Sequence, residues 1–220
     1  MKIIIPLQTC STRVRNKNLR NFIGKKSLFD IKAEQILKVF DPNKVFVSSE
    51  LLSAKKQVKK YGFNFLLRDK KYTGNKIKQP DLIGHILKDI PDSKEDIGWV
   101  QVTTPLFDDF KDCLSTWTKE QKNHDSLLVV REVKHIISDN NIPVNFNFGY
   151  WHKVSQDISK LYEVAWSFFI IKRQVFNECK YHIGYNPYKY ISNFLNVDID
   201  TEEDFKKAQE AYSKLHAPYK

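Results

Sequence analysis

The stretch KIIIPLQTCSTRVRNKNL, residues 2–19, indicates the fold because it joins an apolar run directly to a polar, cationic loop. Its first part, Lys2 to Pro6, has the length and composition of a buried strand. The run is too short for the hydrophobic region of a signal peptide, and no small-residue cleavage site follows it. We therefore predict a first strand whose carboxyl end opens into a polar loop.

Beyond this strand, apolar runs alternate with stretches of helical spacing. Strands are predicted at residues 45–47, 63–67, 98–102, 126–130, 165–171 and 197–200. Helices are predicted at residues 29–40, 51–61, 81–90, 110–119 and 202–215. This alternation is typical of an α/β fold with a mostly parallel sheet, in which ligands bind at the carboxyl ends of the strands.

The chain, residues 1–220, has the size of a single domain with one sizeable core. Residues 138–160 are rich in Asn, Pro and aromatic residues and show no clear period, so we predict an excursion from the core. Such segments often cover a site or contact another chain, and both roles, lid and dimer contact, stay open here. No run of ~18 apolar residues is present, so we expect no membrane partner.

The three cysteines, Cys10, Cys113 and Cys179, are far apart and odd in number. Their spacing fits neither a metal site nor a disulfide framework. We therefore expect a cytoplasmic protein without structural disulfides.

The formal net charge of +10 admits three interpretations. The lysines are spread over many segments, which is typical of a solvated surface without special meaning. The second interpretation is a basic site for a polyanionic small molecule. The third is a nucleic-acid-binding domain, but no known module signature accompanies the charge, so we expect no nucleic-acid partner.

The loop after the first strand, residues 6–19, carries hydroxyls and cations in close succession. Backbone N–H groups and cationic side chains that follow a strand are suited to wrap a triphosphate. The glycine pattern of a P-loop or of a dinucleotide-binding turn is missing, which sets both aside. A solvated basic loop stays open as the alternative.

Asp198 and Asp200 are two residues apart at the end of a predicted strand, so both carboxylates are expected on the same face. Two carboxylates with phosphate oxygens are the donors that Mg²⁺ usually takes. The following residues, Thr201 to Asp204, form a capping box that opens the last helix. Capping explains Thr201 and Asp204 but leaves Asp198 without a structural role.

Polar residues also end the strand predicted at 98–102, where Gln101 and Thr103 are candidates to face a ligand. Termination of the strand by Thr-Pro is the alternative. The six histidines show no metal-ligand spacing. Four tryptophans are expected to pack in the protein rather than to stack on a ligand: Trp99, Trp117, Trp151 and Trp166.

Taken in order, these segments resemble the acylneuraminate (CMP-sialic acid synthetase-like) cytidylyltransferase family, with partial similarity to the KDO cytidylyltransferases. The resemblance covers nearly the whole chain and rests on five blocks, with Ser155-Gln156-Asp157 as a further segment. The blocks are Ile4-Ile5-Pro6 with Ser11, Lys17 and Asn18; Val47-Ser48-Ser49-Glu50; Leu67-Arg68; Gln101-Val102-Thr103-Thr104-Pro105-Leu106; and Asp198-Ile199-Asp200-Thr201-Glu202-Glu203-Asp204-Phe205.

The resemblance implies a Rossmann-like, three-layer α/β/α nucleotidyltransferase fold, a homodimer, and transfer of CMP from CTP to an acidic sugar with Mg²⁺ as cofactor. Arg13, Lys17 and Asp200 would be catalytic, and Asp198 with Asp200 would hold the metal. The residues that would bind CTP are Leu7, Gln8, Ser11, Thr12, Arg13, Lys17, Asn18 and Arg68. The residues that would bind the acceptor are Gln101, Thr103 and Gln156.

The chain departs from the family pattern at several positions. The first-loop Arg of the family falls at Gln8, and the Lys after Ser falls at Thr12, whereas Ser11-Thr12-Arg13 is similar to the KDO enzymes. The Arg-Pro-Asn-Gly that holds the sugar carboxylate in sialate enzymes reads Val164-Ala165-Trp166-Ser167 here. We therefore expect an acceptor other than ordinary sialic acid: another nonulosonate-like acid, with a phosphonate or a different acid as the alternative. A catalytically degenerate CTP-binding subunit is a further alternative.

Overall fold

The computed structural model describes residues 1–217 except residues 10, 12, 75 and 92–93. In these residues seven strands form one sheet in the order β5-β4-β1-β6-β8-β7-β9, and β8 is antiparallel to both of its neighbours while the other pairs are parallel. The strands are β1 (Lys2–Pro6), β4 (Val45–Ser49), β5 (Asn64–Leu67), β6 (Ile97–Val100), β7 (Ser126–Val133), β8 (Leu161–Ile171) and β9 (Pro187–Ile191). A separate hairpin pairs β2 (Asn21–Ile23) with β3 (Lys26–Ser27).

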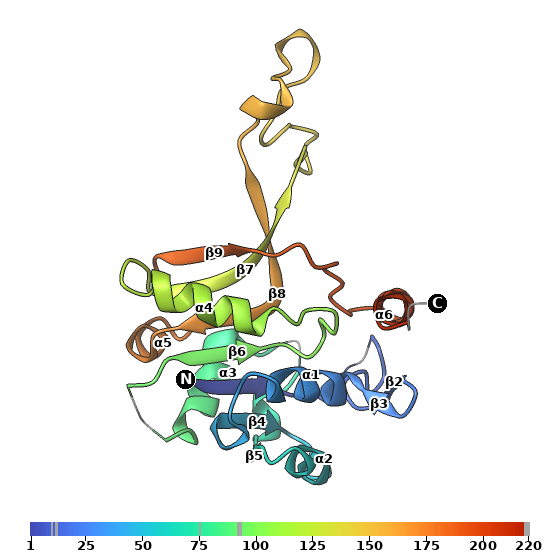
Figure 1. The fold of residues 1–220 in the computed structure, drawn as a ribbon, viewed down its shortest axis with the longest axis vertical. Helices are drawn as coiled ribbons and strands as arrows, with labels where there is room; N and C mark the ends of the chain where they lie inside the picture. The colour runs from blue at the N-terminus through green and yellow to red at the C-terminus, as the bar shows by residue number, and fades with distance from the viewer. Residues whose placement is uncertain (10, 12, 75, 92–93, 218–220) are drawn as a thin grey trace.

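Helices cover both faces of the sheet, which gives three layers (Figure 1). One face carries α1 (Leu28–Leu37), α2 (Ala54–Lys60) and α4 (Phe110–Glu120), and the other carries α3 (Gln79–Lys88) and α5 (Arg173–Cys179). The last helix, α6 (Glu202–Leu215), packs beside the β2–β3 hairpin. Short 3-10 turns lie at η1 (Pro42–Lys44), η2 (Lys70–Tyr72), η3 (Gly149–Trp151) and η4 (Ser155–Asp157). None of the described helices has the length and apolar character needed to cross a membrane.

Strand β1 shows why this sequence builds three layers. Successive side chains of a strand point to opposite faces of the sheet. Ile3 and Ile5 pack with α1, α2 and α4, whereas Ile4 packs with α3 and α5. All three side chains are fully buried, so an unbroken apolar run is what this central strand requires. The predicted α/β fold with a mostly parallel sheet is confirmed.

The topology fixes where a ligand can bind. Strands β4 and β6 flank β1 on opposite sides. The loops that leave the neighbouring strands β1 and β6 therefore run in different directions. In open α/β sheets such a switch point leaves a crevice at the carboxyl ends of the strands. The polar loop after Pro6 and the segment from Gln101 to Thr104 meet at this edge.

The prediction of a strand at residues 197–200 is wrong. After β9 the chain runs from residue 192 to residue 200 outside the sheet and returns to the ends of β6 and β1. Its backbone is held near β6 by one hydrogen bond, in which Ile199 N donates to Thr103 O at 3.0 Å. Asp198 and Asp200 are therefore placed by a loop rather than by a ladder of hydrogen bonds.

Residues 134–160 form a long arm between β7 and β8 that extends away from the sheet (Figure 1). The paired ends of β7 and β8 lead into it, from Val130 opposite Val164 to Val133 opposite Leu161. Several apolar side chains on the arm are exposed, among them Tyr150 at 92% and Trp151 at 74%.

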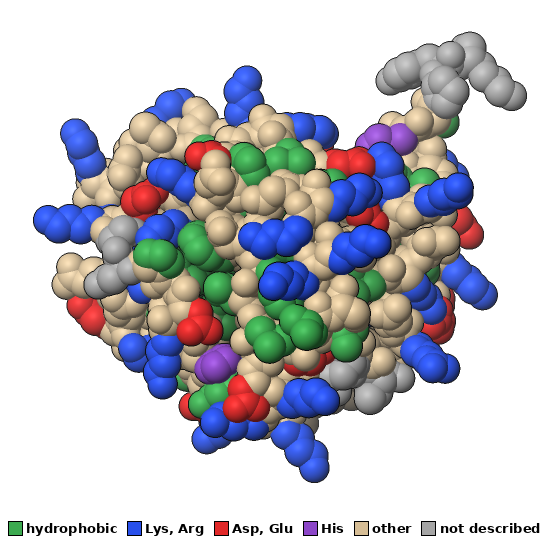
Figure 2. All heavy atoms as spheres, turned by 90° about the horizontal axis from the view of Figure 1, so that it is seen from below, with side chains coloured by type: hydrophobic (Ala, Val, Ile, Leu, Met, Phe, Trp, Pro, Cys, Tyr) green, Lys and Arg blue, Asp and Glu red, His purple; other side chains and the backbone are tan. Residues whose placement is uncertain are grey.

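The positive charge is spread over the surface. On the face seen in Figure 2, Lys and Arg side chains lie around the rim and in the centre, with acidic side chains among them. Several lysines of the described chain form ion pairs with nearby acids, for example Lys44 with Glu95 at 2.8 Å and Lys207 with Glu203 at 2.7 Å.

Candidate functional site

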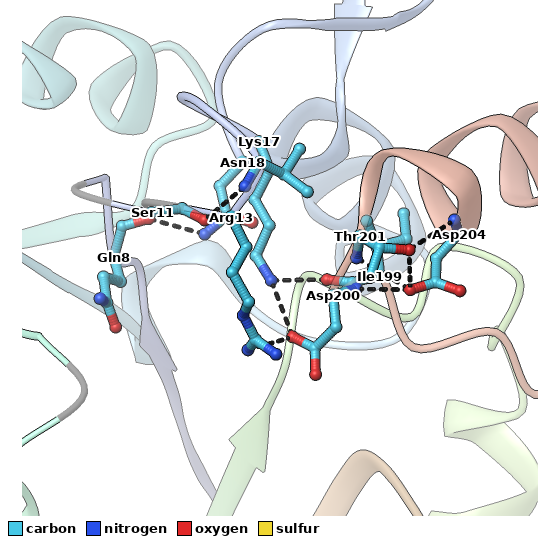
Figure 3. A network of polar contacts seen from close by, with 10 residues as sticks. Gln8, Ser11, Arg13, Lys17, Asn18, Ile199, Asp200, Thr201 and Asp204 are labelled. Carbon is cyan, nitrogen blue, oxygen red and sulfur yellow. Dashed lines mark hydrogen bonds and ion pairs between the residues drawn. The ribbon is translucent and has the colours of Figure 1, made fainter.

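A polar cavity of about 230 Å³ opens at the carboxyl ends of β1 and β6. It contains nine of the residues predicted for the site. They are Gln8, Ser11, Arg13, Lys17, Asn18, Gln101, Thr103, Asp198 and Asp200, and the remaining lining residues are Pro6, Val102 and Trp166. Residues from opposite ends of the sequence thus meet in one place, which Figure 3 shows for the first loop and the segment before α6.

The first loop is held in shape by Asn18. Its side-chain Nδ2 donates to Gln8 O at 2.7 Å, and its backbone oxygen accepts from Phe29 N at 3.0 Å, in the first turn of α1. Asn18 therefore joins both ends of the loop to the helix that follows. Its Oδ1 is buried and has no hydrogen-bond partner in the described residues, so this oxygen can accept a hydrogen bond from a ligand.

Arg13 and Lys17 share the carboxylate of Asp200 (Figure 3). Arg13 Nη2 lies 2.8 Å from Asp200 Oδ1, and Lys17 Nζ lies 3.4 Å from the same oxygen. Lys17 also donates to Ile199 O at 2.5 Å. The Arg13 side chain is 59% exposed, and exposed ion pairs contribute little to stability. Arg13 can therefore exchange Asp200 for phosphate oxygens at low cost, whereas the Lys17 side chain is 13% exposed and more firmly held.

Asp200 is positioned by the start of α6. The Thr201 side chain accepts from Asp204 N at 3.1 Å, and Asp204 Oδ2 accepts from Thr201 N at 2.8 Å, which is the predicted capping box. Asp204 Oδ2 also accepts from Asp200 N at 3.2 Å. Hydrogen bonds from Thr201 lower the pKa of the Asp204 carboxyl, so it stays charged and keeps this turn fixed.

Asp198 has the environment expected of a metal ligand. Burial raises the pKa of its carboxyl, while a hydrogen bond with Thr103 opposes that shift. Its Oδ1 is buried without a hydrogen-bond partner in the described residues. A divalent cation beside Asp198 and Asp200 would satisfy that oxygen, and Mg²⁺ usually takes one or two carboxylates. No cluster of three or more His, Cys, Asp and Glu residues suited to a metal exists in the described part of the chain. The residues present therefore fit Mg²⁺ with phosphate and water as its other ligands.

Arg68 lies in a second, smaller cavity of about 100 Å³ that shares Pro6, Gln8 and Gln101 with the first. Its Nη2 lies 2.7 Å from Glu50 Oε2 and 3.4 Å from Leu7 O. Glu50 in turn accepts from Thr9 N at 2.7 Å. Burial raises the pKa of Glu50, but hydrogen bonds from Thr9 and the charge of Arg68 outweigh it and lower the pKa. Arg68 and Glu50 thus hold the start of the first loop.

Besides Arg68, two predicted residues of the described chain, Leu7 and Gln156, do not line the first cavity. The Leu7 side chain is fully buried in the core, its backbone N donates to Ser48 O and its backbone O accepts from Arg68. Contact of Leu7 with CTP stays a prediction. Gln156 lies on the exposed arm, away from the cavity lining. Thr12, like Cys10, lies outside the described residues.

Trp166 is the residue that the sequence analysis missed. It was expected to pack in the protein, as Trp99 and Trp117 do, but it is 40% exposed and lines the cavity beside Gln101 and Thr103. Its backbone φ of 36° is unusual for a residue other than glycine. The surrounding apolar run indicates a buried strand, so no local signal marks this position.

Comparison with known proteins assigns the chain to a family. Residues 2–215 match the family model of the cytidylyltransferases. No curated protein matches the chain in sequence.

Solved structures share the fold at low identity. A CMP-2-keto-3-deoxy-manno-octonic acid synthetase complexed with CTP has a TM-score of 0.66 and 12% identity, with 97% of this chain and 98% of that chain covered. A 4-diphosphocytidyl-2C-methyl-D-erythritol synthase from Anaerococcus prevotii has a TM-score of 0.63 and 10% identity, with 96% and 98% covered. A glucose-1-phosphate thymidylyltransferase from Bacillus anthracis has a TM-score of 0.62 and 11% identity, with 100% and 98% covered.

Proposed function

The chain belongs to the cytidylyltransferase family, and on this premise we propose that it transfers CMP from CTP to an acidic sugar of the nonulosonate type, with release of pyrophosphate. It is a CTP-dependent enzyme. The observation that carries the proposed site is the meeting of Arg13 and Lys17 with Asp198 and Asp200 in one cavity. Cations for phosphates and carboxylates for a metal are the two requirements of nucleotidyl transfer.

Arg13 and Lys17 would bind the phosphates of CTP. Both cations reach the same oxygen of Asp200, so a triphosphate that enters the cavity finds two donors already directed at one point. Arg presents a planar set of N–H groups that suits phosphate oxygens, and Lys supplies a point charge. The loop that carries them also offers backbone N–H groups at a strand end.

Asp198 and Asp200 would hold Mg²⁺. The unpartnered Asp198 Oδ1 and the carboxylate of Asp200 are hard oxygen donors on one side of the cavity. When bound, Mg²⁺ would neutralise charge on the phosphate oxygens. Arg13 and Lys17, relieved of Asp200, would then be available for the phosphates.

The acceptor would occupy the side of the cavity formed by Gln101 and Thr103. In the reaction, a hydroxyl oxygen of the acceptor forms a bond to the α-phosphorus of CTP, the bond from that phosphorus to the bridging oxygen of pyrophosphate breaks, and the hydroxyl proton is released to solvent. The protein contributes position and charge rather than covalent chemistry. The cytidine half would lie toward Asn18 Oδ1 and the smaller cavity beside Arg68.

The arm would contact a second copy of the chain. Its exposed Tyr150 and Trp151 are large apolar side chains on a segment that projects from the body (Figure 1). Contiguous exposed apolar side chains of this kind mark interaction surfaces. In a homodimer, Gln156 on the same arm could then reach a ligand bound to the partner.

The test is pyrophosphate release from CTP and Mg²⁺ over a panel of acceptors. The panel holds N-acetylneuraminate, 3-deoxy-manno-octulosonate, another nonulosonate and 2-aminoethylphosphonate. Turnover with a sugar acid supports the proposal. Turnover with the phosphonate alone would show that the acceptor is a phosphonate rather than a sugar acid. CTP binding without turnover of any acceptor would show that the chain is a CTP-binding subunit.

A further inference from the structure

Trp166 forms a wall of the cavity on the side of β6 and β8. Gln101 N donates to Ser167 O at 2.9 Å, which fixes the residue after Trp166 against the end of β6. The order β1-β6-β8 places the phosphate-binding loop on one side of Gln101 and Trp166 on the other. The indole therefore stands on the acceptor side of the site.

The backbone around Trp166 turns its side chain into the cavity. The β7–β8 register shifts between Leu128 and Val130, and Trp166 lies in the bulge on the opposite strand, with φ of 36°. Such a backbone conformation is unfavourable for a bulky side chain, and residues of this kind cluster at active sites. Bulges next to active sites commonly redirect a side chain.

The indole is held by two other rings. It meets Phe169 edge to face at 5.9 Å between ring centroids and His182 at 5.7 Å. His182 is buried, and burial lowers its pKa to about 3, so it is a neutral ring in an aromatic group. His182 also stacks on Trp99 at 5.7 Å. Trp166 is thus fixed in orientation although 40% of its surface is open.

Within the part of the chain that the structure describes, the acceptor side of the cavity has no cation of its own. Among the described residues that line it, Arg13 and Lys17 carry positive charge, and both lie at Asp200. The lining at the end of β6 includes an amide, Gln101, and a hydroxyl, Thr103, which also bonds the carboxylate of Asp198. A large aromatic face with hydrogen-bonding groups in the same cavity suits a molecule with an apolar ring face and hydroxyls at its edge.

We propose that Trp166 is the stacking platform of an acceptor subsite that takes a cyclic sugar, whose C–H face lies on the indole while Gln101 and Thr103 bind ring hydroxyls. This inference rests on the proposed nucleotidyl transfer and deepens it. In this subsite the protein selects its acceptor by the ring face and the hydroxyls of the sugar rather than by an ion pair with the sugar carboxylate. Open-chain acids and phosphonates have no ring face to offer and are poor acceptors.

The kinetic test compares Trp166→Ala and Trp166→Phe with the wild type. With 3-deoxy-manno-octulosonate or N-acetylneuraminate as acceptor, Trp166→Ala raises the acceptor KM about tenfold or more and leaves the KM for CTP unchanged, while Trp166→Phe retains part of the affinity. Tyr185→Ala is the matched control, because Tyr185 is an exposed aromatic residue outside the cavity. An acceptor KM within about twofold of wild type, or an equal rise in the KM for CTP, overturns the proposal.

A binding measurement covers the case in which neither sugar is turned over. The indole N–H signal of Trp166 is assigned in the ¹⁵N NMR spectrum by its loss in Trp166→Phe, and the two sugars and 2-aminoethylphosphonate are titrated in the presence of CMP. The sugars shift this signal, and the phosphonate does not. Absence of a shift with both sugars overturns the subsite. Failure of CTP to bind, measured separately by calorimetry, overturns the proposed function instead.

Discussion

Lys32 Nζ lies 3.0 Å from the carbonyl oxygen of Thr104, although 72 residues separate them in sequence. The same nitrogen donates to Phe107 O at 2.8 Å and is fully buried on α1. Lys32 therefore holds the loop after β6 in place. Thr103, in the same loop, accepts a hydrogen bond from Ile199 N, and Ile199 lies between the two candidate metal ligands in sequence. A neutral amine has two N–H groups, which is enough for both carbonyls.

This buried lysine predicts a pH dependence of stability. Burial lowers the pKa of Lys32 from 10.5 to about 7. Folding therefore releases a proton between these two values, so the free energy of unfolding falls as pH is lowered from 10.5 to 7, by up to about 1.4 kcal/mol per pH unit, and this loss levels off below pH 7. Urea unfolding of the wild type and Lys32→Met between pH 6 and 10 measures the difference. Equal dependence of the unfolding free energy on pH in the two proteins would contradict the lowered pKa of Lys32.

Asp198→Asn and Asp200→Asn are each expected to lower kcat roughly 100-fold or more, because each removes a charged metal ligand. Pyrophosphate release at increasing Mg²⁺ concentration measures the loss. Glu203→Gln is the control, since Glu203 is an exposed carboxylate of α6 that pairs with Lys207 outside the cavity. Activity near wild type in both Asp variants would remove them from the site.

Arg13→Gln is expected to raise the KM for CTP roughly tenfold or more, because it removes a charge-assisted contact to phosphate. Lys17→Gln is expected to act in the same direction and also to loosen the loop at Ile199 O. Arg15→Gln, an exposed residue of the same loop that does not line the cavity, should leave the KM unchanged. Steady-state kinetics with CTP as the varied substrate measures these KM values. An equal rise in KM in the Arg15 variant would indicate general attraction of CTP by a basic loop rather than specific contacts.

The arm predicts a second copy of the chain as partner. Replacing its two most exposed aromatic residues, Tyr150→Ser with Trp151→Ser, should shift the protein from dimer to monomer in sedimentation velocity, because stable interfaces bury about 800 Å² per partner around apolar anchors. Leu52→Ser, an exposed apolar residue outside the arm, is the control and should leave the mass unchanged. A monomeric wild type would disprove the dimer contact.

The sequence was sufficient for the central strands and for the covering helices except α5, because burial on both faces or on one face leaves a periodic pattern; the short helix α5 was not predicted. It was insufficient for β9, which begins with Pro187 and lies at the edge of the sheet, where only partial burial is required. The antiparallel direction of β8 also left no trace, since a strand buried on both faces has the same composition in either direction.

The candidate site was predictable where its polar side chains are close together in sequence. It was not predictable where the pairing of distant strands determines the orientation of a side chain. Hydroxyls and cations in one loop and two carboxylates before a capping box indicated Arg13, Lys17, Asp198 and Asp200. The orientation of Trp166 depends on a shift in register between β7 and β8, which only the paired strands define. Leu7 was assigned to the ligand by its place in a motif, yet its apolar side chain is buried in the core.

Strand β8 has a mechanical consequence for the protein. It runs from Leu161, where the arm ends, through the bulge that carries Trp166 in the cavity wall, to Ile171 in the sheet. The arm and the indole are thus joined by one strand, which pairs with β7 on both sides of the bulge. A displacement of the arm is therefore expected to reach the cavity wall at the bulge, where the strand can bend.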